Sequence, residues 1–530
     1  MSELTHVVCL GGGWVAIHLA RALRPAIRRG KVNLTVISRD NYSTVHGLIA
    51  EMLTCKIHPL QINASVREVI APAVLHNAEI ESIDVATRQV RTRRLLDGRV
   101  HTLSYDHLVV GVGSVEDFSR YAGIAEHTFP LKTFADAYRL RNHLLTVLEM
   151  AAIESDPEER RRLLTFVIAG GNYAGVEVAT DLADYFRRLT RRRYRELRTT
   201  EFRVVLLEHG ARILPELGKR YPKLVSYAEK RVAGLGVEVH LNTGLDAATT
   251  EGAVTSADKR ISTHTIITCT GMKSSPLLEQ FPFRRDQRGR LVTDEFCRVP
   301  EADNIWAGGD CAAVPHPDGG SCPPLAHYAQ KAGENIGTNI LRVLASKPLK
   351  KYSFNGLGEA CTLGHRCAIA HMKGLQAHGY FAWVGWRFIV LTMFVPSWTR
   401  RVRLMSDWWW TLILGRDVVN PRIVERGTVG HLLYEAGQII VAVGDTRPYH
   451  YLVESGDVEI ISENKTRLGS VPQGGYLGHT TRPSVDCCIR AASRVRLLVL
   501  DDDAAKALSL VRPDIAMLLK EGAGAATACK

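Results

Sequence analysis

Short apolar runs alternate with helical periodicity from residue 6 to about residue 345. Runs such as 7–10, 163–169 and 203–207 are almost entirely apolar, as strands buried on both faces of a sheet are. The first two lead into glycine-rich turns and then into stretches whose apolar residues recur with helical spacing. This order predicts parallel α/β domains, with the dinucleotide-type fold present twice.

The last part of the chain follows different patterns. Residues 380–398 are nearly continuous apolar sequence, with Arg387 as their only charge. From about residue 424, short alternating strands are separated by Gly, Asp and Pro turns. This second pattern predicts a separate all-β module.

The first glycine-rich turn follows residues 6–10 and reads Gly11-Gly12-Gly13-Trp14-Val15-Ala16. In this G-x-G-x-x-A pattern Gly11 permits the tight turn, Gly13 lets a pyrophosphate approach the backbone, and Ala16 keeps the helix close to the sheet. The N-terminus of that helix supplies partial positive charge. The next strand ends in Ser38-Arg39 instead of an acidic residue, so Ser38 is expected to accept from the ribose without charge.

The second glycine-rich turn is Gly170-Gly171-Asn172-Tyr173-Ala174-Gly175. Asn172 stands where the middle glycine normally lies. Asparagine tolerates left-handed backbone, but its side chain would crowd a pyrophosphate. The following strand ends at Glu208, whose carboxylate can bind both ribose hydroxyls of NADH and repel the 2′-phosphate of NADPH. Two nucleotides suggest hydride transfer from a nicotinamide in the second domain to a flavin in the first.

Charge and cysteine content narrow the choice of partners. The chain has 530 residues and a formal net charge of +12, which calls for an anionic partner such as nucleic acid, a membrane surface or a phosphate-rich cofactor. The arginine-rich stretch 187–198 is interpreted as a solvated helix face. The 11 cysteines include no C-x-x-C pair, so we expect neither a metal site nor a disulfide framework. No signal-peptide pattern opens the chain, which favours a reducing, cytoplasmic location.

The first domain is expected to be completed late in the chain. Residues 105–114 read as its closing strand, while residues 304–312 give another strand, a Gly-Asp turn and a helix start. Gly309 would let the backbone approach a ligand, and Asp310 could accept from a ribityl hydroxyl. With these residues the sequence resembles the two-dinucleotide-binding flavoproteins and, among them, the type II NADH dehydrogenases. The resemblance covers about residues 1–420 and includes Phe129-Pro130-Leu131-Lys132-Thr133, Gly175-Val176-Glu177 and Thr270-Gly271.

The resemblance implies FAD as cofactor and NADH as substrate. The residues implied for FAD are Gly11, Gly12, Gly13, Ala16, Ser38, Arg39, Gly113 and Asp310. Those implied for NADH are Gly170, Gly171, Asn172, Gly175, Glu208 and Gly271. Glu177 would lie near the stacked rings and assist proton or hydride movement; alternatively, a glutamate two residues into a helix simply suits the helix dipole.

The resemblance also implies a quinone as electron acceptor. The family motif A-Q-x-x-x-Q corresponds here to residues 326–331, with His327 and Lys331 in place of the two glutamines. The histidine could donate to a quinone carbonyl, and the lysine could stabilise a reduced oxyanion.

The apolar segment 380–398 approaches the length of a membrane span, but Arg387 would then lie in hydrocarbon and the β-module would be exported. We therefore expect a helix lying in the interface of an anionic membrane, peripheral on the cytoplasmic face of the cell membrane. The residues expected at headgroup depth are Trp383, Trp386, Trp408, Trp409, Trp410, Arg400, Arg401 and Arg403. The alternative is that these aromatic residues form a buried core or a dimer seam.

The C-terminal module resembles a cyclic-nucleotide-binding jelly roll over residues 434–459. That family binds its ligand through a Gly-Glu pair and an arginine, whereas here His479 follows Gly478 and Val485 stands at the arginine position. We expect a degenerate regulatory or dimer-forming module, because the main polar contacts are missing. Arg482 and Arg490 leave weak anion binding as the alternative.

The expected fold class is α/β, with two Rossmann-type dinucleotide-binding domains, an interfacial membrane-anchoring helical segment and a C-terminal all-β jelly roll. The expected boundaries are 1–162 and 276–350 for the FAD-binding domain, 163–275 for the NADH-binding domain, 351–423 for the membrane-associating region and 424–530 for the jelly roll. The expected protein is a homodimer that oxidises NADH with quinone, pumps no protons and binds no nucleic acid. The alternatives are an NADH oxidase or diaphorase using oxygen or a protein acceptor, and a flavin-based redox sensor acting through the C-terminal module.

Overall fold

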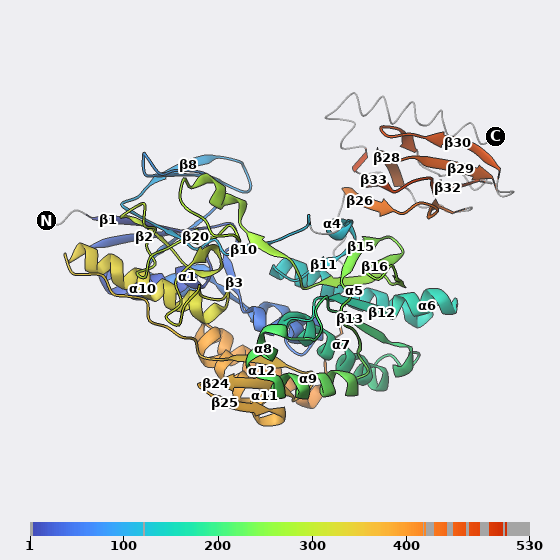
Figure 1. Ribbon diagram of the computed structural model, residues 1–530, viewed down its shortest axis with the longest axis horizontal. Helices are drawn as coiled ribbons and strands as arrows, with labels where there is room; N and C mark the ends of the chain where they lie inside the picture. Colours follow the sequence, from blue (N-terminus) through green and yellow to red (C-terminus); the bar gives the residue numbers. More distant parts are fainter. Residues whose placement is uncertain are drawn as a thin grey trace.

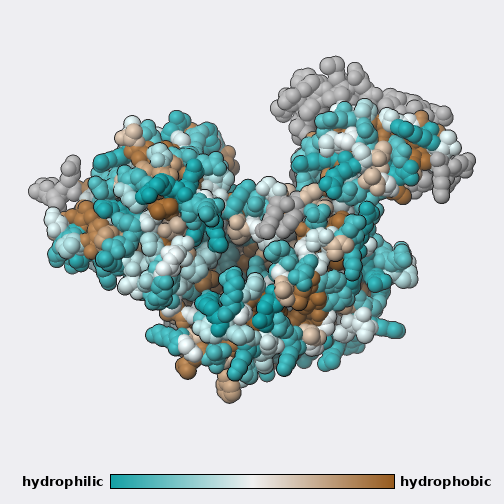
Figure 2. Space-filling view, in the orientation of Figure 1, coloured by the Kyte–Doolittle hydropathy of each residue, from teal (hydrophilic) through white to brown (hydrophobic). Residues whose placement is uncertain are grey.

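A computed structural model of the chain describes residues 4–119, 122–416, 418–419, 429–442, 449–462, 466–477, 487–501 and 504–505. Two α/β domains form the body of the molecule, and an all-β domain lies to one side (Figure 1). On the face drawn in Figure 2, a broad hollow separates the β8 side of the first domain from this all-β domain.

The first domain is built on a five-stranded parallel sheet in the order β21-β9-β1-β2-β5. Its strands are β1 (Thr5–Leu10), β2 (Val32–Ser38), β5 (Val74–Asn77), β9 (His107–Val110) and β21 (Ile305–Ala307). Helices α1 (Trp14–Arg28) and α10 (Ala326–Leu344) lie side by side (Figure 1). They approach closely because α10 carries glycines where side chains would overlap α1: a Cβ at Gly333 would lie 2.3 Å from the carbonyl oxygen of Val15.

Smaller elements surround this sheet. They are β3 (Tyr42–Thr44), α2 (Ile49–Leu53), β4 (Asn63–Ser65), α3 (Val66–Ile70), the antiparallel strands β6 (Glu79–Asp84), β7 (Gln89–Arg93) and β8 (Val100–Ser104), and the paired strands β20 (Leu291–Val292) and β22 (Ala312–Ala313). The expected late completion of the first domain is seen directly, since β21 pairs with β9 in parallel.

The second domain repeats the plan with the parallel order β11-β18-β12-β13-β14. Its strands are β11 (Phe129–Pro130), β12 (Thr165–Ala169), β13 (Arg203–Leu207), β14 (Glu238–His240) and β18 (Thr265–Thr268). Its helices are α4 (Ile124–His127), α5 (Phe134–Ile153), α6 (Pro157–Leu163), α7 (Tyr173–Arg192), α8 (Pro215–Arg220) and α9 (Pro222–Gly234). The antiparallel strands β15 (Leu245–Thr249), β16 (Gly252–Thr255) and β17 (Arg260–Ser262) form a separate sheet.

The boundary between the two domains differs from the expected residue 163. β11 pairs with β18 of the second sheet, and Ala137 and Leu140 of α5 belong to the core that also holds Phe166. Residues 129–162 therefore belong to the sheet and core of the second domain, and Phe134 also contacts Tyr42 of the first. The antiparallel pair of β10 (Ser114–Glu116) and β19 (Met272–Ser274) joins the two domains.

The region after α10 begins with an antiparallel sheet, not with membrane helices. Its strands are β23 (Glu359–Thr362), β24 (Ala368–Met372) and β25 (Leu375–His378), and they are followed by α11 (Gly379–Ile389), the π-helical turn η6 (Val390–Phe394) and α12 (Trp398–Leu414). Buried Val390, Val395 and Leu404 join the core of the second domain. In the described part of the chain, no helix combines the length and apolar character needed to cross a bilayer.

The C-terminal domain consists of two antiparallel four-stranded sheets, β26-β33-β28-β31 and β27-β32-β29-β30. The strands are β26 (Val429–Tyr434), β27 (Ile439–Val441), β28 (Tyr449–Ser455), β29 (Val458–Ser462), β30 (Arg467–Val471), β31 (Tyr476–Leu477), β32 (Cys487–Ala491) and β33 (Val495–Asp501). The expected all-β character is confirmed. Gly478, His479, Arg482 and Val485, on which the degenerate-site interpretation depends, lie outside the described residues.

Candidate nucleotide-binding and redox site

The first glycine loop connects β1 to α1 and leaves open space where a phosphate would lie. Gly11 has φ +97°, and a Cβ there would lie 2.4 Å from the carbonyl oxygen of Gly111, so only glycine fits. By contrast, a Cβ at Gly13 would meet no atom within 4 Å, and neither would one at Gly113, which follows β9. No side chain caps α1, so its first N–H groups face this space. The loop therefore fits a pyrophosphate.

Ser38 and Arg39, predicted for the adenosine side of such a site, lie at the end of β2 beside the first glycine loop. Ser38 is half-buried beside Gly12, where a Cβ would lie 2.8 Å from the Ser38 hydroxyl oxygen. The side-chain amide of Asn77 donates to the carbonyl oxygens of Ser38 and Arg39 at 2.9 and 2.8 Å. The strand end is thus held in place, while the Arg39 side chain is exposed.

Asp310 lies in a polar cluster near the carboxyl ends of β9 and β21. Its carboxylate accepts from the Ser114 hydroxyl at 3.0 Å and lies 3.7 Å from the Lys132 ammonium group. Lys132 also donates to Ser114 at 3.0 Å. Lys132 belongs to the sequence motif 129–133, but the sequence does not show that it lies beside Asp310, because Lys132 and Asp310 are far apart in the chain.

The second glycine loop is closed by its own side chains. Gly170 has φ +109°, and a Cβ at Gly175 would lie 1.8 Å from the carbonyl oxygen of Gly170. Asn172 has φ −76°, so its backbone is not in the left-handed conformation that asparagine tolerates. Its side chain instead caps α7 by accepting from the Gly175 N–H at 3.1 Å. An asparagine occurs here because it is a strong helix N-cap. Gly271, with φ +78°, follows β18 after two intervening residues.

Glu208 holds the second loop from the end of β13. Its two carboxylate oxygens accept from the N–H groups of Gly171 and Gly210, each at 2.6 Å, and the residue is buried. Each carboxylate oxygen has a further lone pair that a ribose hydroxyl can use. The predicted ribose contact is therefore compatible with this arrangement.

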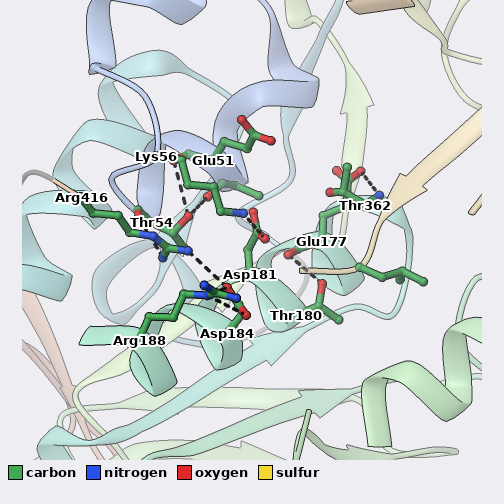
Figure 3. A network of polar contacts seen from close by, with 12 residues as sticks. Glu51, Thr54, Lys56, Glu177, Thr180, Asp181, Asp184, Arg188, Thr362 and Arg416 are labelled. Carbon is green, nitrogen blue, oxygen red and sulfur yellow. Dashed lines mark hydrogen bonds and ion pairs between the residues drawn. The ribbon is translucent and has the colours of Figure 1, made fainter. Parts of the chain in front are cut away.

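Glu177 lies in α7 beside β23, where its carboxylate accepts from the Thr362 N–H at 2.9 Å (Figure 3). Burial raises the pKa of Glu177 to about 8, with the Thr362 N–H opposing the rise and the Asp181 carboxylate adding to it. Because α7 begins at Tyr173, Glu177 is its fifth residue and lies beyond the first turn. The helix-dipole interpretation is therefore wrong, since that effect fades after the first turn and would lower the pKa.

A buried ionic network extends from Glu177 along α7 (Figure 3). Asp181, one turn further on, forms a buried ion pair with Lys56 at 2.5 Å. Asp184, another turn on, accepts from both Arg188 and Arg416 at 3.0 and 3.2 Å. The spacing of the three acids in α7 could have indicated one shared face, but the basic partners come from distant segments.

A second cluster missed from the sequence lies beside the second loop. The Tyr173 hydroxyl donates to Glu359, which also pairs with Arg220 at 2.5 Å. Burial raises the pKa of Glu359, but polar contacts with His371, Tyr173 and Arg220 outweigh it and lower the pKa to about 2. Glu359 therefore carries a fixed negative charge beside the second glycine loop.

The residues of the predicted quinone motif occupy different environments on α10. His327 is buried against the rings of Tyr328 and Phe354, and burial lowers its pKa to about 4. Lys331 is exposed and pairs with Glu334 at 2.7 Å. Between them, buried Gln330 donates to the carbonyl oxygen of Met393 in η6 at 3.2 Å and connects α10 to the predicted membrane segment.

Cys55 is the first cysteine after the first glycine loop. This residue is buried, and the Tyr185 hydroxyl donates to its sulfur at 3.7 Å. Burial raises the pKa of the thiols of Cys9 and Cys269, the nearest cysteines to the two glycine loops, well above the usual range. A neutral buried thiol is a poor nucleophile.

Two dinucleotide-type domains with a completed first sheet define a flavoprotein-like pyridine nucleotide oxidoreductase. The family model described as pyridine nucleotide-disulphide oxidoreductase matches residues 5–333. The chain belongs to this family.

Among curated proteins, a probable NADH dehydrogenase of Dictyostelium discoideum is 26% identical, and the match covers 78% of this chain and 91% of that protein. A type II NADH:quinone oxidoreductase of Mycobacterium tuberculosis is 27% identical over 76% of this chain and 86% of its own. Among solved structures, NDH2 of Plasmodium falciparum in complex with NADH has a TM-score of 0.72 at 17% identity, and the match covers 79% of this chain and 100% of that chain.

Proposed function

We propose that this protein transfers a hydride from NADH to FAD and passes two electrons to a membrane quinone, without pumping protons. The observation that carries the proposal is the pair of glycine loops, one on each dinucleotide-type sheet, in domains joined by β10 and β19. Similar proteins named as type II NADH:quinone oxidoreductases align over most of their length and support it.

Each loop has a distinct task in this reaction. The open space at Gly13 and the uncapped N-terminus of α1 would hold the pyrophosphate of FAD, and Asp310 would accept from its ribityl chain. Glu208 would accept from the ribose of NADH. Bound FAD would supply the two-electron chemistry that links NADH to the quinone.

Glu177 is the residue that we propose for proton transfer. Reduction of a quinone by NADH consumes one proton from solution for each hydride transferred, so a proton donor is required. A carboxyl group with a pKa near 8 is protonated at neutral pH and can release and regain a proton there. His327, kept neutral by burial, is proposed to donate a hydrogen bond to the quinone, while exposed Lys331 is a weaker candidate.

We also propose that α11 and α12 bind the surface of an anionic membrane. The exposed large apolar side chains of the two helices are Tyr380, Phe381, Val384, Phe388, Trp398, Val402, Met405, Trp409, Trp410, Leu412, Ile413 and Leu414. Hydrophobic side chains also reach the lower edge of the face in Figure 2, where Figure 1 places α11 and β25. Such a surface is large for a protein that stays in water.

The only charge in the apolar segment points away from this surface. Arg387 pairs with buried Glu51 at 2.7 Å and lies between the rings of Trp383 and Trp408, 4.2 and 4.1 Å from their centroids. Trp386 and Trp408 are partly buried against the core of the second domain, which supports the buried-core alternative for these two residues. Trp409 and Trp410 are exposed.

The remaining parts of the proposal concern location and assembly. We place the protein on the cytoplasmic face of the cell membrane as a homodimer, with its C-terminal β-domain as a jelly-roll regulatory or dimer-forming module. Arg490, considered for anion binding, pairs with Glu459 at 2.6 Å. The β-domain contacts the second domain through Arg496 with Glu126 and through the Leu433 N–H donating to His127.

Anaerobic mixing tests the proposed reaction. Purified protein is mixed with NADH while the flavin absorbance is followed, and a quinone is then added. Bleaching followed by fast return with quinone is expected. Return only with oxygen would indicate an NADH oxidase, and no bleaching would favour a redox sensor.

A variant tests the role of Glu177 in the same experiment. Glu177→Gln is expected to retain bleaching by NADH but to slow the return with quinone by at least about a hundredfold, the usual contribution of a proton donor. The matched control is Glu216→Gln, an exposed carboxylate on α8, for which no change is expected. An unchanged return rate in Glu177→Gln would overturn the assigned role.

A further inference from the structure

A cavity of about 730 Å³ lies at the C-terminal end of α7, between that helix and α12. Glu177 and the cavity-lining residue Arg191 both belong to α7. Arg191 follows Glu177 by 14 residues, which corresponds to roughly 21 Å along the helix. The arginine-lined end of the cavity is therefore remote from Glu177, whereas Lys56, which also lines the cavity, pairs with Asp181, one turn from Glu177.

One wall of the cavity is cationic and lacks counter-charges. Among the described residues, no ion pair or side-chain hydrogen bond engages the guanidinium groups of Arg191, Arg192, Arg193, Arg195 and Arg366, and no acidic residue lines the cavity. The stretch 187–198 is thus more than the solvated helix face expected from the sequence, because half of it lines one cavity. Five unpaired guanidinium groups around one cavity repel one another unless an anion lies between them.

Four further basic side chains line the cavity, and each of them is paired with a buried carboxylate. Lys56 pairs with Asp181, and Arg188 and Arg416 pair with Asp184 (Figure 3). Arg387, the fourth basic residue here, pairs with Glu51. These buried carboxylates fix the basic groups in place. The site is therefore built in advance of any ligand, which lowers the cost of ordering it on binding.

Apolar side chains also line the cavity and continue onto the proposed membrane surface. They are Trp383, Trp408, Leu412 and Leu414, of which Leu414 is 67% exposed. A ligand here meets both arginines and hydrocarbon-compatible side chains. Free phosphate would use only the arginines, whereas a phospholipid would use both.

We propose that this cavity binds the phosphate headgroup of an anionic phospholipid, with the acyl chains lying along the exposed end of α12. Guanidinium groups form paired hydrogen bonds with phosphate oxygens, and the exposed apolar end of α12 offers a surface for the acyl chains. The inference rests on the membrane association proposed above. It adds a defined lipid site to a general surface attraction.

Vesicle binding of the full chain tests the site with two variants that each remove three positive charges. The cavity variant is Arg192→Gln, Arg195→Gln and Arg366→Gln; the control variant is Arg99→Gln, Arg285→Gln and Arg288→Gln, all exposed in the first domain. Co-sedimentation is measured with vesicles of phosphatidylcholine alone and of phosphatidylcholine mixed with phosphatidylglycerol.

The cavity variant is expected to lose affinity for the anionic vesicles on the order of a hundredfold, from about fivefold per arginine. The control variant is expected to lose far less, and both should bind neutral vesicles and reduce a water-soluble quinone as the wild type does. Equal losses in the two variants would overturn the site while leaving membrane association intact. Wild-type protein that binds neither vesicle would instead contradict the proposed membrane association, and quinone reduction in solution tests the catalytic proposal separately.

Thermal unfolding distinguishes a lipid from a soluble phosphate. Short-chain phosphatidylglycerol below its micelle concentration is expected to raise the Tm of the wild type and of the control variant, but not that of the cavity variant. Glycerol phosphate and inorganic phosphate at the same concentration should have little effect. An equal rise with inorganic phosphate would overturn the lipid assignment, and so would the absence of any rise with the lipid.

Discussion

The two glycine loops have the same fold but differ in what already occupies them. In the first loop, the position of Gly13 faces open space, and no side chain caps the helix. In the second loop, Asn172 stands at the corresponding position and accepts from the Gly175 N–H, while Glu208 accepts from the Gly171 N–H. A nucleotide entering the first loop finds free donors, whereas one entering the second competes with protein acceptors. The difference suits a resident cofactor in one domain and an exchanging substrate in the other.

The helices that follow the loops differ in a related way. The fifth residue of α1 is His18, and the fifth residue of α7 is Glu177. Burial lowers the pKa of His18 to about 4 and raises the pKa of Glu177 to about 8. Both groups are therefore neutral at pH 7, but only the glutamate carries a proton that it can release near that pH.

The largest effect on ligand binding is expected from Gly13→Asp in the first loop. Aspartate is a good N-cap, so the fold should persist, but its charge would stand where the pyrophosphate lies. At about 4 Å two like charges near a protein surface repel by roughly 4 kcal/mol, which corresponds to about a thousandfold loss of FAD affinity. Flavin absorbance of the purified protein checks this. Asn172→Asp in the second loop is the control and should remain yellow; a yellow Gly13→Asp protein would contradict the comparison.

The next effect concerns the pH dependence of stability. The folded-state pKa of Glu177, about 8, lies above its ordinary value of 4.5, so its favourable contribution is complete below pH 4.5 and is lost as the pH rises through 8. Relative to Glu177→Gln, the wild type should lose up to about 5 kcal/mol of unfolding free energy over this range. Urea unfolding at several pH values measures it.

Comparison of the wild type with His18→Gln should show the opposite pH dependence of the unfolding free energy. Because the folded-state pKa of His18 is lowered, its contribution to the unfolding free energy is present above pH 6.5 and is lost as the pH falls through about 4.

For Glu177, the contradicting outcome is a difference in unfolding free energy between the wild type and Glu177→Gln that does not change with pH. That result would show that Glu177 is not held protonated.

A smaller effect is expected when Glu208 is replaced by glutamine. An amide has one acceptor oxygen in place of two, so the second loop loses an N–H partner and NADH loses a charged ribose contact. We expect the KM for NADH to rise about tenfold and the preference over NADPH to weaken, with flavin content unchanged. Steady-state kinetics with both nucleotides measure this, and an unchanged preference would exclude the ribose role.

The smallest effect sharpens the comparison directly. Asn172→Gly restores the usual glycine and frees the Gly175 N–H for a phosphate. The KM for NADH should fall by about two- to threefold, while stability falls by only about a few tenths of a kcal/mol, the typical difference between asparagine and glycine at an N-cap. A raised KM would show that Asn172 itself contacts the nucleotide.

The features that could be predicted from the sequence are those that depend on short local patterns of residues. The two glycine turns and the strand that completes the first sheet were found because each combines an apolar run with a glycine whose backbone is constrained. The β-domain was found from alternation and turn residues. Such patterns depend on neighbours within about ten positions.

What was missed depends on contacts between distant segments. The sequence alone suggests that Arg387 would lie unpaired in lipid. Its partner Glu51 precedes it by 336 residues and so cannot be recognised from local sequence. β11 was placed in the wrong domain because two strand residues, Phe129 and Pro130, are too few to show which sheet they join. Glu177 was placed too early in its helix because α7 begins directly after Asn172.

The late return of the chain to the first sheet has a consequence for biosynthesis. β9 ends at Val110 and is fully buried, yet its neighbour β21 begins only at Ile305, after the second domain. During translation, β9 must therefore remain with an unpaired edge until nearly the whole second domain has left the ribosome. Unpaired apolar edges invite aggregation, so the nascent chain is expected to need chaperone protection over this interval.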